Sequence, residues 1–249
     1  MGVKNRRILL GFGLLALVSL LGFIPQPVSA ALVWSETFNE LNDEYWHFVA
    51  SQIIDGALRP VEQPPQTILD RSAMRAYRDS NVTVGTWKFD ITETGEWGEE
   101  LDVLRVYFIS PGWPDLSDYY ALYIVHFSDS GGTGYSYNIE RWYDSRRTTL
   151  DNYLGETVPS VIGTLQHFTI TRTGSGLTSV YLNSSLILQA TDTSINTSSY
   201  FGFYTWDDWA FDNVYVYNTV NNNTTLPLLL AGAAGVAIIA AIVIYSKRR

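Results

Sequence analysis

The chain has 249 residues and contains no cysteine. A domain exported from the cell must therefore fold without disulfides, which favours a prokaryotic surface over a disulfide-rich animal one. The absence also excludes a cysteine nucleophile. Histidine is almost as scarce, and His47, His126 and His167 lack the spacing of a metal-binding motif. The sequence has neither a Gly-x-Ser-x-Gly elbow nor a glycine-rich phosphate loop in front of a helix, which argues against common hydrolases and nucleotide-binding enzymes.

Positive charge is sparse in the middle of the chain. Six of the sixteen Lys and Arg residues lie near the two ends, and all twenty-five Asp and Glu residues lie between them. These six are Lys4, Arg6, Arg7, Lys247, Arg248 and Arg249. Ten cations against twenty-five acids leave the central part with a net charge of −15. This charge argues against nucleic acid or anionic lipid as a partner, and it is compatible with cation binding.

The first thirty residues have the pattern of a signal peptide. A basic start precedes the apolar run Ile8 to Ile24, and the small-residue sequence Val28-Ser29-Ala30 follows two prolines. We expect cleavage after Ala30; the alternative is an uncleaved signal anchor, because the apolar run is long.

The last residues predict a membrane anchor. Residues 226–245 carry no charge and would span about 30 Å as a helix, the thickness of the bilayer's hydrocarbon core. The basic residues 246–249 should stay in the cytoplasm, so the rest of the chain faces outward. Residues 218–225 are polar and predict a short stalk. A sorting signal, in which the helix is removed, has the same pattern. The sequence therefore predicts a single-pass cell-surface protein, and its glycosylation sequons agree with export: Asn81, Asn183, Asn196, Asn222 and Asn223.

Residues 31–217 predict one all-β domain. Segments rich in Val, Ile, Thr, Tyr, Phe and Trp, such as "YYALYIVHF" and "HFTITRTG", alternate with clusters of Gly, Asp, Asn, Ser and Pro. This pattern is typical of an antiparallel sandwich or jelly roll. A tight hairpin is expected around Asn183-Ser184. Residues 70–77 form the one helix candidate, which we interpret as a strand edge or a turn.

The order of these features resembles the concanavalin A-like lectin/glucanase superfamily, which includes laminin-G-like and laminarinase-type jelly rolls. The resemblance covers residues 33 to 217 and rests on "WSETFNE" near the start, "IIDGALRP", "YFGFYTW" and the closing "FDNVYVYN". It implies that the amino-terminal and carboxy-terminal strands lie side by side. Because the superfamily contains hydrolases, lectins and adhesion modules, the resemblance alone does not decide the function.

The segment "GEWGEELDVLRVYF" decides between hydrolase and binding domain. Laminarinase-type hydrolases carry Glu-x-Asp-x-Glu or Glu-x-Asp-x-x-Glu on one strand, and Glu100 and Asp102 match only its first half. The resemblance would make Glu100 the nucleophile, but Leu104 and Arg105 occupy the positions of the acid/base. Protonation of the leaving group is indispensable, so the sequence predicts a degenerate site without catalysis. An acid/base from another strand, such as Glu140, is the alternative.

Aromatic residues make up 14% of the chain, and some of them lie beside acids in segments that predict loops. Aromatic rings stack on the C–H faces of sugars while carboxylates accept hydrogen bonds from hydroxyls. We expect a shallow glycan site in "YTWDDW", with Trp113 as the second choice; the alternative is that these Trp residues cap the ends of the sandwich. The expected ligand-binding residues are Tyr204, Trp206, Asp207, Asp208, Trp209 and Trp113.

The resemblance also implies a structural Ca²⁺. The ion would join the first strand, a glycine-bearing turn and the Asp of the closing strand, here Glu36, Asp55-Gly56 and Asp212. The alternative is that Asp212 only bonds to the neighbouring backbone. The sequence thus predicts an extracellular, membrane-tethered domain that binds carbohydrate or a cell-envelope surface. A hydrolase with a displaced acid/base and a structural envelope protein are the alternatives.

Overall fold

The computed structural model describes residues 30–40, 44–61, 73–95, 102–112, 118–129, 132–154, 163–205 and 209–219. The membrane helix predicted over 226–245, the basic tail and residues 1–29 of the predicted signal peptide lie outside these ranges. In the part of the chain that is described, no helix has the length and apolar character needed to cross a bilayer. The first two residues of the predicted stalk, Asn218 and Thr219, belong to the last strand.

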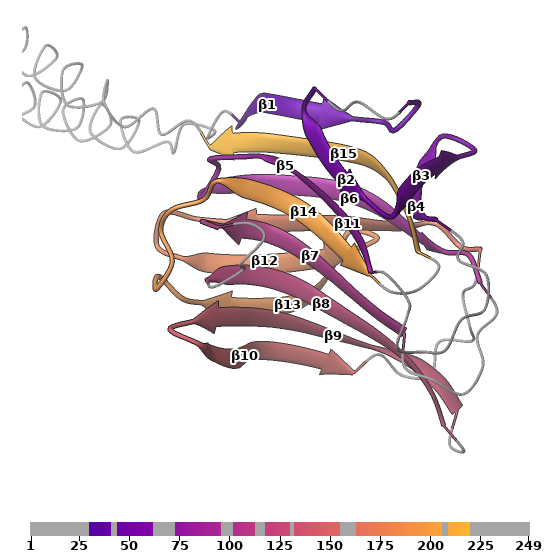
Figure 1. The fold of residues 1–249 in the computed structure, drawn as a ribbon. Helices are drawn as coiled ribbons and strands as arrows, with labels where there is room; N and C mark the ends of the chain where they lie inside the picture. Colours follow the sequence, from indigo (N-terminus) through magenta and orange to yellow (C-terminus); the bar gives the residue numbers. More distant parts are fainter. Residues whose placement is uncertain are drawn as a thin grey trace, which may run out of the picture. The chain divides into compact units, whose positions relative to one another are not determined.

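Two antiparallel sheets are packed face to face over residues 30–219 (Figure 1). The eight-stranded sheet has the order β13-β12-β11-β6-β15-β4-β3, and β1 pairs with β15 beside this path. Its strands are β1 (Ala30–Glu36), β3 (Ser51–Ile54), β4 (Ala57–Pro60), β6 (Gly85–Glu93), β11 (Gln166–Arg172), β12 (Leu177–Leu182), β13 (Ser185–Thr191) and β15 (Trp209–Thr219).

The seven-stranded sheet has the order β10-β9-β8-β7-β14-β5-β2. Its strands are β2 (Trp46–Val49), β5 (Met74–Asp79), β7 (Asp102–Ser110), β8 (Tyr119–Asp129), β9 (Gly132–Tyr143), β10 (Arg146–Leu154) and β14 (Tyr200–Thr205). One face of this sheet packs on the eight-stranded sheet, and we call its other face the outer face.

The core between the sheets is built mainly from aromatic rings. Alternate residues of each central strand point inward, so Trp87 and Phe89 of β6 meet rings from the opposite sheet. Trp46 stacks on Phe203 with ring centroids 6.2 Å apart, and both rings are fully buried. Burial of each such ring contributes about 2–3 kcal/mol before the entropic cost of ordering it. The aromatic richness of the sequence is therefore mostly a packing requirement.

Several predictions about the strands are confirmed. β1 pairs with β15 from Ala30 opposite Thr219 to Glu36 opposite Val214, which places the terminal strands side by side (Figure 1). A two-residue turn at Asn183-Ser184 joins β12 to β13, and both residues have positive φ, as a tight hairpin requires. The helix candidate at 70–77 is a strand from Met74 onward, as the interpretation as a strand edge anticipated. The polar strand β10 was not predicted, because an edge strand needs little apolar sequence.

A polar cluster holds the connection that crosses from β13 to β14. The Asp192 carboxylate accepts hydrogen bonds from the Tyr120 hydroxyl and the Ser194 backbone N–H, and pairs with Arg141 at 2.5 Å. The buried Arg172 guanidinium donates to the carbonyls of Asp192 and Ile195 at 2.9 and 3.2 Å. Burial alone would raise the pKa of Asp192, but these donors hold it below its ordinary value.

This cluster makes the stability of the fold depend on pH. Because the pKa of Asp192 is lower in the folded state, its contribution is complete at neutral pH and is lost as the pH falls below about 4. We expect Asp192→Asn to lower the free energy of unfolding at pH 7 by about 2 kcal/mol. The variant should also lose less stability than the wild type between pH 5 and pH 3. Chemical denaturation across this pH range measures both effects, with the exposed Asp144→Asn as control. Parallel acid limbs would contradict this assignment.

Candidate functional site

The outward positions of β7 are the first test of the hydrolase alternative. Leu104, Val106 and Phe108 of this strand are fully buried in the core. The alternating positions 103, 105 and 107 therefore belong to the outer face, and Val103, Arg105 and Tyr107 occupy them. A catalytic series of carboxylates along this strand would need acidic residues at just these positions. The described outward positions of β7 hold no carboxylate.

The predicted catalytic pair is only partly within the described residues. Asp102 begins β7 and lies opposite His126 in the backbone pairing of β7 with β8. Glu100 lies outside the described ranges. Leu104, one of the two positions where the acid/base was sought, is a core residue. The other, Arg105, carries a guanidinium on the outer face, and neither side chain can donate a proton to a leaving group.

A row of alternating arginine and tyrosine side chains crosses the outer face. Cross-strand pairing places Tyr204 of β14 opposite both Arg75 of β5 and Arg105 of β7, and places Arg105 opposite Tyr123 of β8. The guanidiniums of Arg75 and Arg105 each lie 5.8 Å from the Tyr204 ring centre. Arg105 and Arg147 of β10 lie 4.5 and 4.8 Å from the Tyr123 ring centre. We call Arg75, Tyr204, Arg105, Tyr123 and Arg147 the arginine–tyrosine strip.

Glu140 of β9 anchors one half of this strip. Its side chain is fully buried, and its Oε1 accepts hydrogen bonds from Nε, at 2.9 Å, and Nη2 of Arg147. The other oxygen, Oε2, lies 3.8 Å from Nε of Arg105, and neither of these two buried atoms has a hydrogen-bond partner within the described ranges. Burial opposes the charge on Arg147, but the carboxylate outweighs it and raises the pKa of the guanidinium above its ordinary value. The Glu140 carboxylate therefore lies between the guanidiniums of Arg147 and Arg105.

A small aromatic cluster lies beside the strip. Tyr107, Tyr119 and Ala121 are buried on the outer face, with Trp142 and Tyr204 packed against them. The Tyr107 and Tyr119 rings meet edge to face at 4.9 Å, and Trp142 stacks on Tyr119 at 6.3 Å. Burial raises the pKa of both phenols, so both stay protonated at neutral pH. The cluster packs against Tyr204 and so contacts the strip through that ring.

The structure places the residues predicted to bind a ligand in different surroundings. Tyr204 lies in the strip, on β14 and half-buried. The prediction for Trp209 is wrong: this residue begins β15, is 1% exposed and packs against Tyr135 in the core. A loop that included all of "YTWDDW" would end at Trp209, but β15 already begins at this residue. The alternation of side chains along β15 then directs the Trp209 ring inward. The other expected residues, Trp206, Asp207, Asp208 and Trp113, lie outside the described residues.

The residues predicted to hold calcium are described in full. Burial raises the pKa of the Asp212 carboxyl, against a hydrogen bond from the Asn213 N–H, and the negative charges of Asp90 and Glu36 raise it further. Glu36 already accepts bonds from two backbone N–H groups, and Asp55-Gly56 forms the β3–β4 turn with positive φ. Within the described ranges, no group of three or more His, Asp or Glu side chains is arranged to hold a metal. The carboxylates of Asp212 and Glu36 repel one another, and a cation between them would relieve this repulsion. Backbone carbonyls would have to supply the remaining oxygen ligands of a calcium ion.

The strip itself was not predicted from the sequence. Arg75, Arg105, Tyr123 and Arg147 are far apart along the chain, and only the strand order brings them into one row. The available signal was the spacing of two between Arg105 and Tyr107, and among Tyr119, Ala121 and Tyr123, which marks a shared face. Which of the two faces points outward could not be read without knowing which residues enter the core.

Comparison with solved structures places this domain among known folds. The sequence matches no protein-family model and no curated protein. The fold is similar to the carbohydrate-binding module CBM66 from Bacillus subtilis, with a TM-score of 0.50, 17% identity and coverage of 68% of this chain and 92% of that one. It is also similar to the Emp47p carbohydrate recognition domain, with a TM-score of 0.53, 11% identity and coverage of 76% and 98%.

Enzymes share the fold as well. The catalytic domain of an endo-1,3-β-glucanase (laminarinase) from Thermotoga petrophila RKU-1 matches with a TM-score of 0.53 and 12% identity, over 78% of this chain and all of that one. At these identities the similarity concerns the fold and leaves the activity open. Residues 30–219 have the concanavalin A-like jelly-roll fold.

Proposed function

We propose that the domain binds carbohydrate at the arginine–tyrosine strip and does not hydrolyse it. The observation that carries this proposal is the row of planar guanidiniums and phenols along one sheet face. Guanidiniums donate paired hydrogen bonds, and the phenol hydroxyls can both donate and accept, as sugar hydroxyls require. The similarity to CBM66 and to the Emp47p carbohydrate recognition domain supports a sugar-binding role for a domain of this fold.

The charge of the strip favours acidic sugars. Arg105 and Arg147 share the single carboxylate of Glu140, and Arg75 is exposed on the opposite side of Tyr204. The five members of the strip together with Glu140 thus have a net positive charge, although the domain as a whole is acidic. Carboxylate or sulfate groups of a glycan would form bidentate hydrogen bonds with these guanidiniums. A polyuronate or a sulfated galactan is therefore expected to bind more tightly than a neutral glucan.

The proposal against hydrolysis rests on the carboxylates of the outer face within the described residues. Both stereochemical routes of glycoside hydrolysis need two carboxyl groups, one of them protonated. Glu140 lies on the outer face but is tied to Arg147 and faces Arg105. The described outward positions of β7 hold Val103, Arg105 and Tyr107, and the acid/base positions of the laminarinase pattern hold Leu104 and Arg105.

We also propose that the domain is displayed at a cell surface. Residues 1–30 would direct export, 226–245 would anchor the chain, and 246–249 would stay in the cytoplasm. A tethered domain with a weak site gains avidity when many copies meet one polysaccharide. Protection of the domain from protease on intact cells, together with cleavage of a carboxy-terminal tag, would contradict this orientation.

The strip can be tested by exchanging one arginine. We expect Arg105→Gln to weaken binding to a polyuronate at least tenfold, because it removes a charged donor from the centre of the strip. Arg146→Gln is the matched control, since Arg146 is exposed on β10 beside Arg147 but outside the strip. Titration calorimetry at low and high salt measures both variants, and unfolding curves verify that they are folded. Equal affinities for the two variants would contradict the proposed site.

Calcium between Asp212, Glu36 and the Asp55-Gly56 turn is a separate proposal. A cation that binds only the folded state raises the melting temperature in proportion to the logarithm of its concentration. We expect millimolar CaCl₂ to raise the melting temperature by several degrees, a chelator to reverse the gain, and Asp212→Asn to abolish it. Asp144→Asn serves as the control. A melting temperature that is the same with calcium and with chelator would show that no stabilising site exists.

A further inference from the structure

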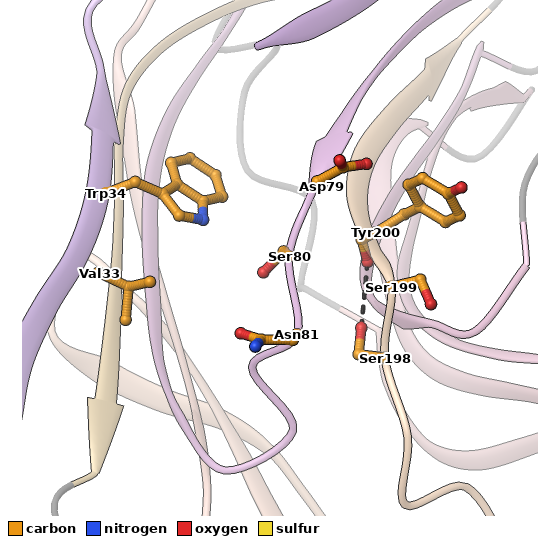
Figure 2. Close-up of a pocket in the computed structure, with 8 residues that line it drawn as sticks. All are labelled: Val33, Trp34, Asp79, Ser80, Asn81, Ser198, Ser199 and Tyr200. Carbon is orange, nitrogen blue, oxygen red and sulfur yellow. Dashed lines mark hydrogen bonds between the residues drawn. The ribbon is translucent and has the colours of Figure 1, made fainter.

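A pocket of about 430 Å³ lies at one edge of the sandwich, away from the arginine–tyrosine strip. It is formed by β1, by the end of β5 with the residues that follow it, and by the segment that leads into β14 (Figure 2). Tyr200, at the start of β14, lines it, whereas Tyr204 of the strip lies four residues further along the same strand. At about 3.3 Å per residue the two side chains are roughly 13 Å apart, so the pocket and the strip are separate places.

Two buried polar groups in this pocket have no partner among the described residues. The indole Nε1 of Trp34 and the hydroxyl of Ser80 make no hydrogen bond with that part of the chain, although Trp34 is only 8% and Ser80 only 5% exposed. In Figure 2 the indole nitrogen and the Ser80 hydroxyl are directed toward one another from opposite sides of the pocket. A buried donor without an acceptor costs about 1–3 kcal/mol, so native structures rarely keep one unless something binds there.

The neighbouring contacts show that these groups are not loosely placed. The Arg78 guanidinium lies 4.5 Å from the Trp34 ring centre and covers that face, so Trp34 offers its N–H edge to the pocket. The Ser80 N–H donates to the carbonyl of Ser199 at 2.8 Å, which ties the two loops of the pocket together. The Ser198 hydroxyl donates to the carbonyl of Tyr200 at 3.2 Å (Figure 2). The walls are therefore fixed while the two polar groups stay unsatisfied.

The charges around the pocket select the ligand. Asp79 lines it with an exposed carboxylate, which disfavours an anion. Arg78, next to Trp34, disfavours a cation. An apolar ligand would leave the Trp34 N–H and the Ser80 hydroxyl unpaired. A neutral molecule that carries several hydroxyls can accept from the indole and exchange a hydrogen bond with Ser80.

We propose that this pocket binds one neutral sugar residue, independently of the strip. The volume lies within the range of small-molecule sites. Sugar of this chemistry can come from two sources: a free glycan, or a glycan attached to the chain itself. Asn81 lines the pocket and begins the sequon Asn81-Val82-Thr83. The test must therefore compare protein made with and without N-glycosylation.

The test follows the Trp34 indole N–H by NMR in the full chain. The protein is labelled with ¹⁵N in its tryptophan indoles and kept in a detergent without a sugar headgroup. Trp34→Phe identifies the signal. Glucose, galactose, mannose and N-acetylglucosamine are titrated to about 100 mM, because one sugar in an open pocket binds with millimolar affinity. We expect at least one of them to shift the signal of Trp34 in a saturable way.

Two variants that leave Trp34 in place make the result decisive. Ser80→Ala should raise the dissociation constant at least threefold, with Asp144→Asn unchanged. In protein from a glycosylating host, Thr83→Ala removes the sequon and keeps Asn81. If the Trp34 signal of the glycosylated protein differs from that of unglycosylated protein, and Thr83→Ala removes the difference, the attached glycan is the sugar in the pocket. Arg105→Gln should leave all of these shifts of the Trp34 signal unchanged. The test of the pocket therefore does not depend on whether the arginine–tyrosine strip binds carbohydrate. If no sugar and no attached glycan moves the Trp34 signal, or Ser80→Ala responds like wild type, the pocket is not a sugar site.

Discussion

The alternation of side chains along β7, β8 and β14 is the constraint on which this molecule depends. Each of these strands must send every second residue into a core of closely packed rings, including Phe108, Phe203 and Trp46. The remaining positions are thereby assigned to the outer face and cannot be exchanged without moving a whole strand by one residue. The identity of the outer-face residues therefore follows from the packing. In β7 the described outward positions are Val103, Arg105 and Tyr107, none of which carries a carboxylate.

The electrostatics of the outer face follow from the same arrangement. Strand order brings Arg75, Arg105 and Arg147 together, although they are separated by about thirty and forty residues in the sequence. A buried carboxylate is tolerable only when it is paired, and Glu140 meets this condition through Arg147 and, at longer range, Arg105. A strongly acidic domain thus presents a locally basic row, which fits the proposed recognition of an acidic polymer.

Much of the fold could be predicted from the sequence because strands and turns leave local signals. The β-branched and aromatic segments, the tight turn at Asn183-Ser184 and the closing strand around Asp212 were all recognisable. The site could not be predicted to the same extent. Trp209 looked like an exposed loop residue because the two acids before it suggested a loop, but one residue of difference in the start of β15 turns its ring inward. Arg75, Tyr123 and Arg147 carried no local signal, since only the pairing of distant strands places them together.

Release of reducing ends from polysaccharide is the most direct test of the central claim, which is binding without hydrolysis. The full chain, in a detergent without a sugar headgroup, is incubated with β-1,3-glucan, β-1,4-glucan and a polyuronate. Bound polymer and new reducing ends are then measured in the same samples. The account predicts retained polyuronate and no reducing ends above those of a buffer control. Reducing ends that accumulate with time, and that disappear in Glu140→Gln or Glu100→Gln, would contradict it.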